Sequence, residues 1–270
     1  MKSLIKYFTL VTIILLNTSC QENDYYDDTP PNPPKNLMVI PGDNQTEINW
    51  DENRESDLAG YNVYFSYEYD GKYELIGSTN VNYYVDKDAV NGEKYFYAVT
   101  AYDYNNNESE LSYDYVYGIA RPQGYNQTVF DYLKYPNQAG YSFSKKLVVP
   151  YDDVEADFFF ENYNGTFYLN VWSDTDIQDM GETVSIYDIN LAPLSGWVLL
   201  GEGENVKYIE ALIGHTYIIW TLDNHFAKIR ITQITPQRLV FDWAYQLVEG
   251  ERQLKRELKI RSGKMILIKK

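Results

Sequence analysis

The chain has 270 residues, enough for one or two domains, and 44% of them are hydrophobic. Its formal net charge of −16 argues against nucleic acid as a partner, because affinity for nucleic acid comes largely from neutralised phosphates. The single cysteine excludes an intramolecular disulfide, so the hydrophobic cores must suffice alone. The 28 tyrosines fit either half-buried strand positions or a recognition surface.

Residues 1 to 19 have the pattern of a signal peptide. Two lysines precede an apolar run, Tyr7 to Leu16, which is too short to span a bilayer, and small residues lead to Cys20. The stretch resembles a bacterial lipoprotein signal, although Asn17 stands where such signals usually carry leucine. The resemblance implies cleavage before Cys20, attachment of lipid such as palmitate to that residue, and an outer membrane lipoprotein in the cell envelope of a Gram-negative bacterium.

Residues 20 to 32 are acidic and then proline-rich, which predicts a solvated, extended tether. Removing the leader takes away two of the 23 basic residues and none of the 39 acidic ones, leaving a formal charge of −18. Anionic lipid would repel so acidic a protein, so we expect membrane attachment through the lipid anchor. Acidic residues soon after the cysteine also resemble the surface-export signals of some Gram-negative lipoproteins, which implies exposure at the cell surface.

Residues 33 to 117 predict seven short strands separated by turns, the pattern of an Ig-like sandwich. The run Lys94–Asp103 alternates with apolar side chains on both faces, which predicts a central strand. The other strands are expected at Asn36–Ile40, Thr46–Asp51, Gly60–Tyr67, Tyr73–Gly77, Val81–Asp86 and near Leu111–Tyr117.

The segments INW, AGYNVYFS and NGEKYFYAVTAYD, in this order after a proline-rich lead, resemble a fibronectin type III domain. The resemblance implies that Trp50 is the core tryptophan and that the Tyr95 hydroxyl returns to the preceding loop. Such domains usually act as spacers or as protein-binding modules. Asp103 and the polar residues 105 to 108 could be calcium ligands, but turn chemistry explains them more simply.

Residues 118 to 125 contain Pro122 and Gly124, which predict a linker, and residues 126 to 270 predict a second antiparallel β-rich domain. The expected fold class is therefore all-β, an Ig-like fibronectin type III sandwich followed by this second domain. Its strands are expected at Val154–Phe160, Phe167–Trp172, Val184–Tyr187, Tyr208–Ala211, Thr216–Thr221, Ala227–Gln233 and Leu239–Tyr245.

The segments AGYSFSKKLVV, ADFFFEN and HTYIIWTLDNHFAKIRIT…LVFDWAYQ distantly resemble the HmuY-like haem-binding lipoproteins. In that family histidines hold the haem, which makes His215 and His225 the haem candidates. A hairpin turning at Asp223-Asn224 would place them about 20 Å apart, at opposite ends of one strand. Two axial ligands must each approach the iron closely, so this geometry argues against a shared site. We therefore expect no cofactor.

No group of residues predicts an enzyme. Residues 152 to 161 hold several acids, but Asp157 and Glu161 would lie roughly 13 Å apart on one strand face, too far for a glycosidase pair. The acids between Asp174 and Glu182 lack the glycine of an EF-hand loop. Neither histidine has a nucleophile motif such as G-x-S-x-G beside it. We expect no catalytic residues and no metal site.

Residues 252 to 270 carry eight basic residues and one acid. This pattern predicts either an edge strand protected by lysines or a basic segment that docks onto the first domain, and the closing MILIKK predicts an added strand. The favoured function is a non-catalytic cell-envelope lipoprotein that binds a protein or glycan partner. The alternatives are a haem or small-molecule carrier of the HmuY type and an accessory module in polysaccharide utilisation.

Overall fold

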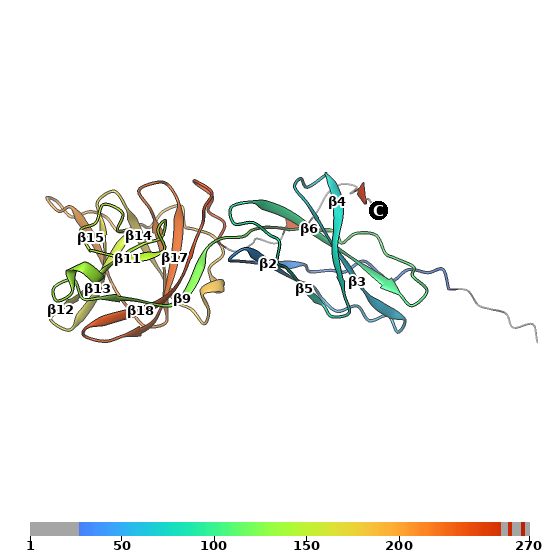
Figure 1. The fold of residues 1–270 in the computed structure, drawn as a ribbon, viewed down its shortest axis with the longest axis horizontal. Helices are drawn as coiled ribbons and strands as arrows, with labels where there is room; N and C mark the ends of the chain where they lie inside the picture. The colour runs from blue at the N-terminus through green and yellow to red at the C-terminus, as the bar shows by residue number, and fades with distance from the viewer. Residues whose placement is uncertain (1–26, 255–258, 261–265, 268–270) are drawn as a thin grey trace, which may run out of the picture.

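The computed structural model describes residues 27–254, 259–260 and 266–267, so the leader and Cys20 lie outside the described residues. The chain forms two β domains that lie end to end (Figure 1), and the expected all-β class is confirmed. Across the described residues, no helix has the length and apolar character needed to cross a membrane.

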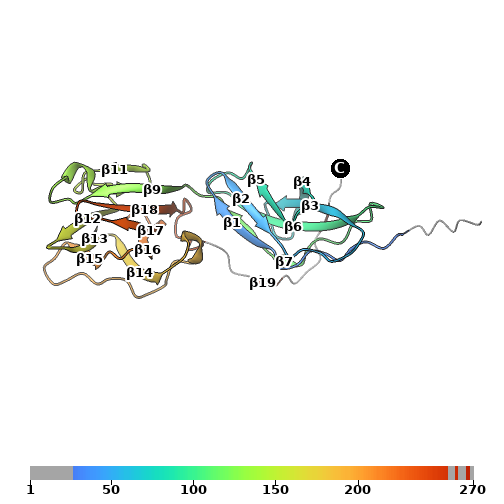
Figure 2. The same ribbon diagram turned by 90° about the horizontal axis from the view of Figure 1, so that it is seen from below.

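The first domain is a sandwich of two antiparallel sheets (Figure 2), as the fibronectin type III resemblance implies. One sheet has the order β1 (Met38–Gly42), β2 (Gln45–Asn49), β5 (Tyr83–Asp86). The other has the order β4 (Lys72–Thr79), β3 (Leu58–Ser66), β6 (Lys94–Asp103), β8 (Tyr117–Ile119). The strand expected near Leu111–Tyr117 is divided between β8 and the short β7 (Asp114–Tyr115).

Strand β6 is central and buried on both faces, as its alternation predicts. Tyr97 and Val99 face the core between the two sheets, while Phe96 and Ala98 face a second apolar cluster on the outer side of the same sheet. A strand covered on both sides gains apolar burial along its whole length, which makes β6 the organising element of this domain.

The two residues that the resemblance marks as structural occupy the expected places. Trp50 is 3% exposed and packs edge-to-face on Tyr61, with ring centroids 5.1 Å apart. The Tyr95 hydroxyl accepts a hydrogen bond from the backbone N–H of Val90 at 3.4 Å, so it does return to the preceding loop.

The first domain extends further toward the N-terminus than the sequence predicts. Asn32 donates from its backbone and side-chain nitrogens to Glu55 Oε1, at 2.8 and 2.7 Å, and the carbonyl of Asp27 accepts from Asn107. Residues 27 to 32 therefore pack against the domain, whereas the sequence placed them in the tether.

The second domain is built from two five-stranded sheets. The first has the order β11 (Leu147–Val149), β10 (Gly140–Ser142), β12 (Phe158–Tyr163), β13 (Thr166–Trp172), β15 (Val206–Glu210). The second has the order β14 (Asp176–Glu182), β16 (His215–Trp220), β17 (Phe226–Ile234), β18 (Arg238–Tyr245), β9 (Gln123–Phe130). The short 3₁₀ turns η1 (Pro136–Gln138) and η2 (Ile186–Asp188) lie in its connections.

Two expectations for this part of the chain are wrong. Strands β8 and β9 occupy most of the expected linker 118–125, and Gly124 lies within β9 instead of ending it. The expected strand Val184–Tyr187 is instead the turn η2, because Ser185 caps it: its hydroxyl accepts from the Tyr187 N–H, and Asp188 accepts from the Ser185 N–H.

The two sheets enclose one large core, but their outer faces differ. The outer face of the β14–β9 sheet is covered by the connection that contains η2: Trp197 packs on Trp220 and Phe226 there. The outer face of the β12–β13–β15 sheet instead carries half-exposed aromatic side chains. This face of the second domain therefore presents aromatic surface to solvent.

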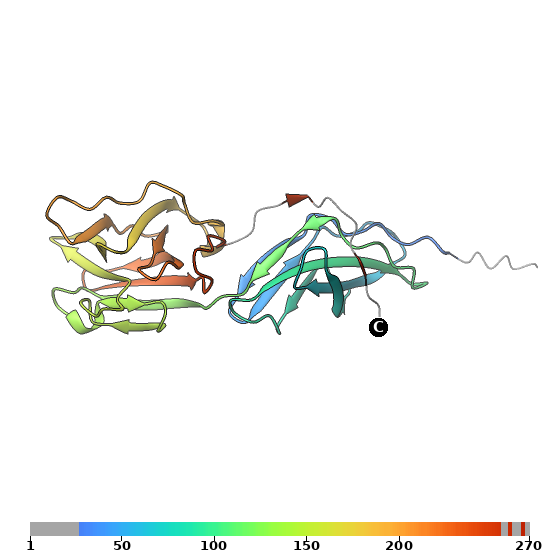
Figure 3. The same ribbon diagram turned by 90° about the horizontal axis from the view of Figure 1, so that it is seen from above.

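The C-terminal tail pairs with the first domain. Strand β19 (Lys259–Ile260) pairs antiparallel with β7, and β20 (Ile266–Leu267) pairs parallel with β4 (Figure 3). The strand expected in MILIKK is present as β20, at the edge of the sheet that contains β4, so the described tail residues both dock onto the first domain and add an edge strand to it.

Candidate functional site

The outward positions of three neighbouring strands form the candidate site. Side chains alternate between the two faces of a strand, so the strand register decides which residues lie together on the outside. One outward row contains Phe159, Asn170 and Tyr208, and the next contains Glu161, Tyr168 and Glu210. Trp172 lies at the end of β13, two positions beyond Asn170.

Six rings make up this surface, which we call the aromatic face: Tyr132, Tyr151, Phe159, Tyr168, Trp172 and Tyr208. Phe159 is 4% exposed and forms the floor, with the rings of Tyr132, Tyr151 and Trp172 centred 5.3, 5.4 and 5.6 Å from it. Tyr168 and Tyr208 meet edge-to-face at 5.7 Å, and Tyr208 is 52% exposed. The rings hold one another in fixed orientations and still present surface to solvent.

A carboxylate lies among these rings. The Asn170 side chain, 3% exposed, donates a hydrogen bond from Nδ2 to Glu161 Oε2 at 3.3 Å. Burial, and then the negative charge of Glu161, raise the pKa of Tyr132, whose hydroxyl therefore lies near the carboxylate. Flat apolar rings around an oriented acceptor suit a ligand that has both apolar faces and hydroxyl donors.

Trp172 also borders an acidic cavity of about 410 Å³. The acids that line it are Asp152, Asp153, Glu155, Asp157 and Asp174. Lys145 forms an ion pair with Glu155 at its edge. Asp157 precedes β12 and lines this cavity, whereas Glu161 lies within β12, beside Tyr168.

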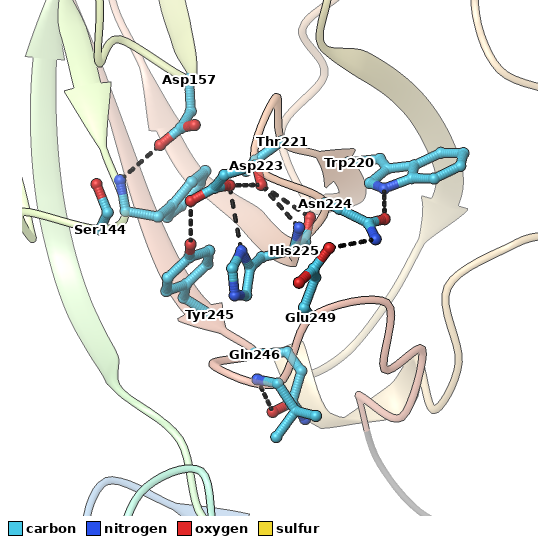
Figure 4. A network of polar contacts seen from close by, with 12 residues as sticks. Ser144, Asp157, Trp220, Thr221, Asp223, Asn224, His225, Tyr245, Gln246 and Glu249 are labelled. Carbon is cyan, nitrogen blue, oxygen red and sulfur yellow. Dashed lines mark hydrogen bonds and ion pairs between the residues drawn. The ribbon is translucent and has the colours of Figure 1, made fainter.

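Asp157 belongs to a polar network at one end of the domain (Figure 4). Its Oδ2 accepts the backbone N–H of Phe143 at 2.7 Å. Burial raises the pKa of Asp157 to about 7, the Phe143 N–H acts against that shift, and the nearby charge of Asp223 adds to it. Asp223 itself accepts from the hydroxyl of Thr221, and its Oδ2 lies 3.4 Å from the Tyr245 hydroxyl.

Of the two histidines of the haem resemblance, His215 begins β16 and His225 lies in the turn between β16 and β17, as the hairpin argument predicts. His215 Nδ1 lies 2.9 Å from Asp179 Oδ2, and His225 Nδ1 lies 3.2 Å from Asp223 Oδ1. The structure does not bring them together, and each imidazole is beside an aspartate of its own.

The polar residues of the loop after β6 form the hydrogen bonds of an ordinary turn. Asp103 Oδ1 accepts the N–H groups of Asn105 and Asn107, both at 2.8 Å, while Glu108 accepts from hydroxyls of neighbouring strands. The structure adds a contact that the sequence does not reveal: carboxylate oxygens of Asp27, Asp57 and Asp103 lie within 4.8 Å of one another. The sequence placed Asp27 in the tether and therefore gave no indication that it lies beside this loop.

The first domain has an aromatic groove of its own, a cavity of about 700 Å³ between β4 and β5. Two of its polar groups are already used by the fold: Asp86 accepts from the buried hydroxyl of Tyr97, and the Tyr95 hydroxyl accepts from Val90. The aromatic face of the second domain, where six rings adjoin an oriented carboxylate, is the stronger candidate.

Sequence reasoning missed the aromatic face. The signal was present in the strands, because residues 159 and 161, then 168, 170 and 172, share one side of their alternation. Tyr132 and Tyr151 come from connections, and only the folded chain places them over Phe159.

No known family model matches the chain. An amylopullulanase from Thermoanaerobacterium saccharolyticum is 36% identical over 104 residues, which are 38% of this chain and 8% of that protein. An amylopullulanase from Thermoanaerobacterium thermosulfurigenes is 38% identical over 105 residues, 38% of this chain and 6% of that protein. The chain thus spans less than about a tenth of the length of these curated relatives.

Among solved structures, an Fn3-like protein from Clostridium thermocellum shares 26% identity over 31% of this chain and 88% of its own, with a TM-score of 0.29. A β-1,2-glucanase from Parabacteroides distasonis shares 27% identity over 35% of this chain and 14% of its own, with a TM-score of 0.30. A DUF4466 family protein from Parabacteroides merdae shares 10% identity over 78% of this chain and 98% of its own, with a TM-score of 0.37. Structural similarities with TM-scores this low do not indicate a function for this chain. The HmuY-like resemblance stays a prediction.

Proposed function

We propose that this chain is a non-catalytic accessory protein of polysaccharide utilisation, held in the cell envelope through Cys20, and that a glycan binds to the aromatic face. The observation that carries the proposal is the cluster of six rings next to Glu161 on the outer face of the β12–β13–β15 sheet, where Tyr168, Trp172 and Tyr208 remain partly exposed. Of the two partner classes expected from the sequence, this surface fits the glycan.

The chemistry of sugars explains the choice. A pyranose ring has C–H groups on its faces and hydroxyls at its rim, so it can pack on an aromatic ring while its rim donates and accepts hydrogen bonds. Tyrosine and tryptophan offer large, rigid, amphipathic contact surfaces at little cost in side-chain entropy. On this face Trp172 and Tyr208 supply such surfaces, and Glu161 supplies an acceptor in the row next to that of Tyr208, beside Tyr168.

The relatives support a role connected with polysaccharides. The curated relatives are named as amylopullulanases. The matches cover only a small part of those proteins, which agrees with a shared accessory module and not with a shared catalytic domain.

Affinity electrophoresis tests the proposal. The mature protein, from residue 20 with Cys20→Ser so that it stays unlipidated, is run through native gels that contain amylopectin, pullulan or mixed-linkage β-glucan. We expect at least one of these glycans to retard the protein. Trp172→Ala and Tyr208→Ala should each weaken that binding about tenfold, since single buried aromatic contacts often dominate an interface.

Tyr104→Ala is the matched control, because Tyr104 is a 75% exposed tyrosine of the first domain. It should migrate like the unmodified protein in every gel. Equal mobility of all variants on every glycan, or loss of retardation in Tyr104→Ala alone, would contradict the assignment to the aromatic face.

A further inference from the structure

Glu161 lies on the aromatic face and, unlike the six rings, it presents a carboxylate. It lies on β12 between the outward residues Phe159 and Tyr163, and the register sets it beside Tyr168 of β13. Tyr132, from the connection before β10, lies against the same strand, because its N–H donates to the Phe160 carbonyl at 3.0 Å and its ring is centred 5.3 Å from that of Phe159. The carboxylate therefore lies beside the rings of Tyr132, Phe159 and Tyr168, where the rim of a sugar stacked on them would lie.

The carboxylate is also oriented in advance. Asn170, almost completely buried beneath the rings, fixes Glu161 through the 3.3 Å hydrogen bond to Oε2. An ionised carboxylate has about four acceptor positions, so this bond leaves others for a ligand. A fixed acceptor loses less entropy on binding than a mobile one and discriminates better between ligands.

The charges around Glu161 restrict the ligand. Within the described strands β12, β13 and β15 the single cation is Lys207, which points to the inner side and binds Asp176 Oδ1 at 2.7 Å and the carbonyl of Thr175 at 2.8 Å. Glu210 lies in the same row as Glu161, and the cavity beyond Trp172 adds five more acids. Lys145 pairs with one of these acids, Glu155, so a uronate or sulfate group would still meet an excess of negative charge here.

Resting on the proposed glycan function, we infer that Glu161 is the specificity-determining residue of the face: its carboxylate accepts hydrogen bonds from neighbouring hydroxyls of an uncharged glycan. The same charge excludes anionic polysaccharides.

The test measures dissociation constants by affinity electrophoresis, with the glycan that retards the protein most as the neutral probe and polygalacturonate as the anionic probe. Glu161→Gln removes the charge and keeps the size of the side chain, and we expect binding of the neutral probe to weaken at least about tenfold. Glu93→Gln is the matched control, because it removes the same charge at an exposed glutamate of the first domain, just before β6 and outside the aromatic face. We expect less than about a twofold change there.

Glu161→Asp provides a second variant, since it keeps the charge but draws the carboxylate away from Asn170 and should also weaken binding. Thermal melting checks that all variants are folded. If Glu161→Gln binds as tightly as the unmodified protein while Trp172→Ala does not, the inference about Glu161 is wrong and the glycan function stands. If polygalacturonate binds as tightly as the neutral probe, the exclusion of anionic glycans is wrong. If no neutral glycan binds, both proposals fall together.

Discussion

At the scale of single residues, buried polar groups decide how the protein responds to pH and to substitution. The pKa of Asp157 rises from an ordinary 3.8 to about 7, first because of burial. Below about pH 4 the group is protonated in both the folded and the unfolded chain. Between about pH 4 and pH 7 the unfolded chain releases a proton that the folded chain keeps, so Asp157 lowers stability progressively as pH rises, and above about pH 7 the full penalty applies.

Asp157→Asn should therefore stabilise the protein only at higher pH. Asparagine keeps an oxygen that can accept the Phe143 N–H and cannot ionise. We expect Tm at pH 8 to rise by roughly 2 to 6 °C over the unmodified protein, with no difference at pH 4. Scanning calorimetry at the two pH values checks this, and a lower Tm at both would contradict the sign of the shift.

Tyr97 gives a second prediction at this scale. Its hydroxyl donates to Asp86 Oδ2 at 2.8 Å, and the two residues are 0% and 7% exposed. Tyr97→Phe deprives a buried carboxylate of a donor, so the free energy of unfolding should fall by about 1 to 3 kcal/mol. Urea unfolding measures the change, with the exposed Tyr104→Phe as a control that should match the unmodified protein.

At the scale of elements, β9 shows that a segment whose sequence resembles a linker can form a strand. Gly124 lies opposite Trp243 of β18, and a Cβ at this position would come within 2.5 Å of the indole Nε1. Because glycine has no Cβ, the indole ring can pack closely against β9 here, and the glycine does not end the strand. Val129, further along β9, is fully buried in the core of the second domain.

The second domain should therefore need β9 to fold. A fragment of residues 120–270 should unfold in one cooperative transition, whereas a fragment of residues 131–270 lacks an edge strand and a core residue. We expect its Tm to be lower by at least about 10 °C, or no cooperative transition at all. Circular dichroism melts of the two fragments check this. Equal melting temperatures would show that β9 is dispensable.

The elements also show how far sequence reasoning reaches. Strand β6 and the β16–β17 hairpin were predictable because their alternation is local and strong. Strand β14 was not, since only Ile177 of its seven residues is buried and, apart from Met180, the rest are polar or glycine. The turn η2 was not, because a side-chain cap outweighed the β propensity of its apolar residues. The aromatic face depends on register between strands and on two connections, which no single segment encodes.

At the scale of the whole molecule, the first domain lies between the described N-terminal end and the aromatic face (Figure 1). The tail pairs with β7 and β4 of that same domain, so both described ends of the chain are connected to it. If Cys20 carries lipid, the first domain would act as a spacer that holds the aromatic face away from the membrane.

The anchor itself is testable independently of the glycan. Cells that express the full chain are grown with labelled palmitate, and the protein is recovered from the membrane fraction. We expect label in the unmodified protein and none in Cys20→Ala, which should keep its leader or leave the membrane fraction. Equal labelling of both proteins would contradict lipid attachment at Cys20.

Hydrogen–deuterium exchange, with and without a saturating concentration of the tightest-binding glycan, tests the central claim most directly. We expect slower exchange in peptides that cover β12, β13 and β15, and unchanged exchange in peptides that cover β1 to β6. Protection confined to the first domain or to the segments around His215 and His225, or no glycan-dependent protection anywhere, would contradict glycan binding at the aromatic face.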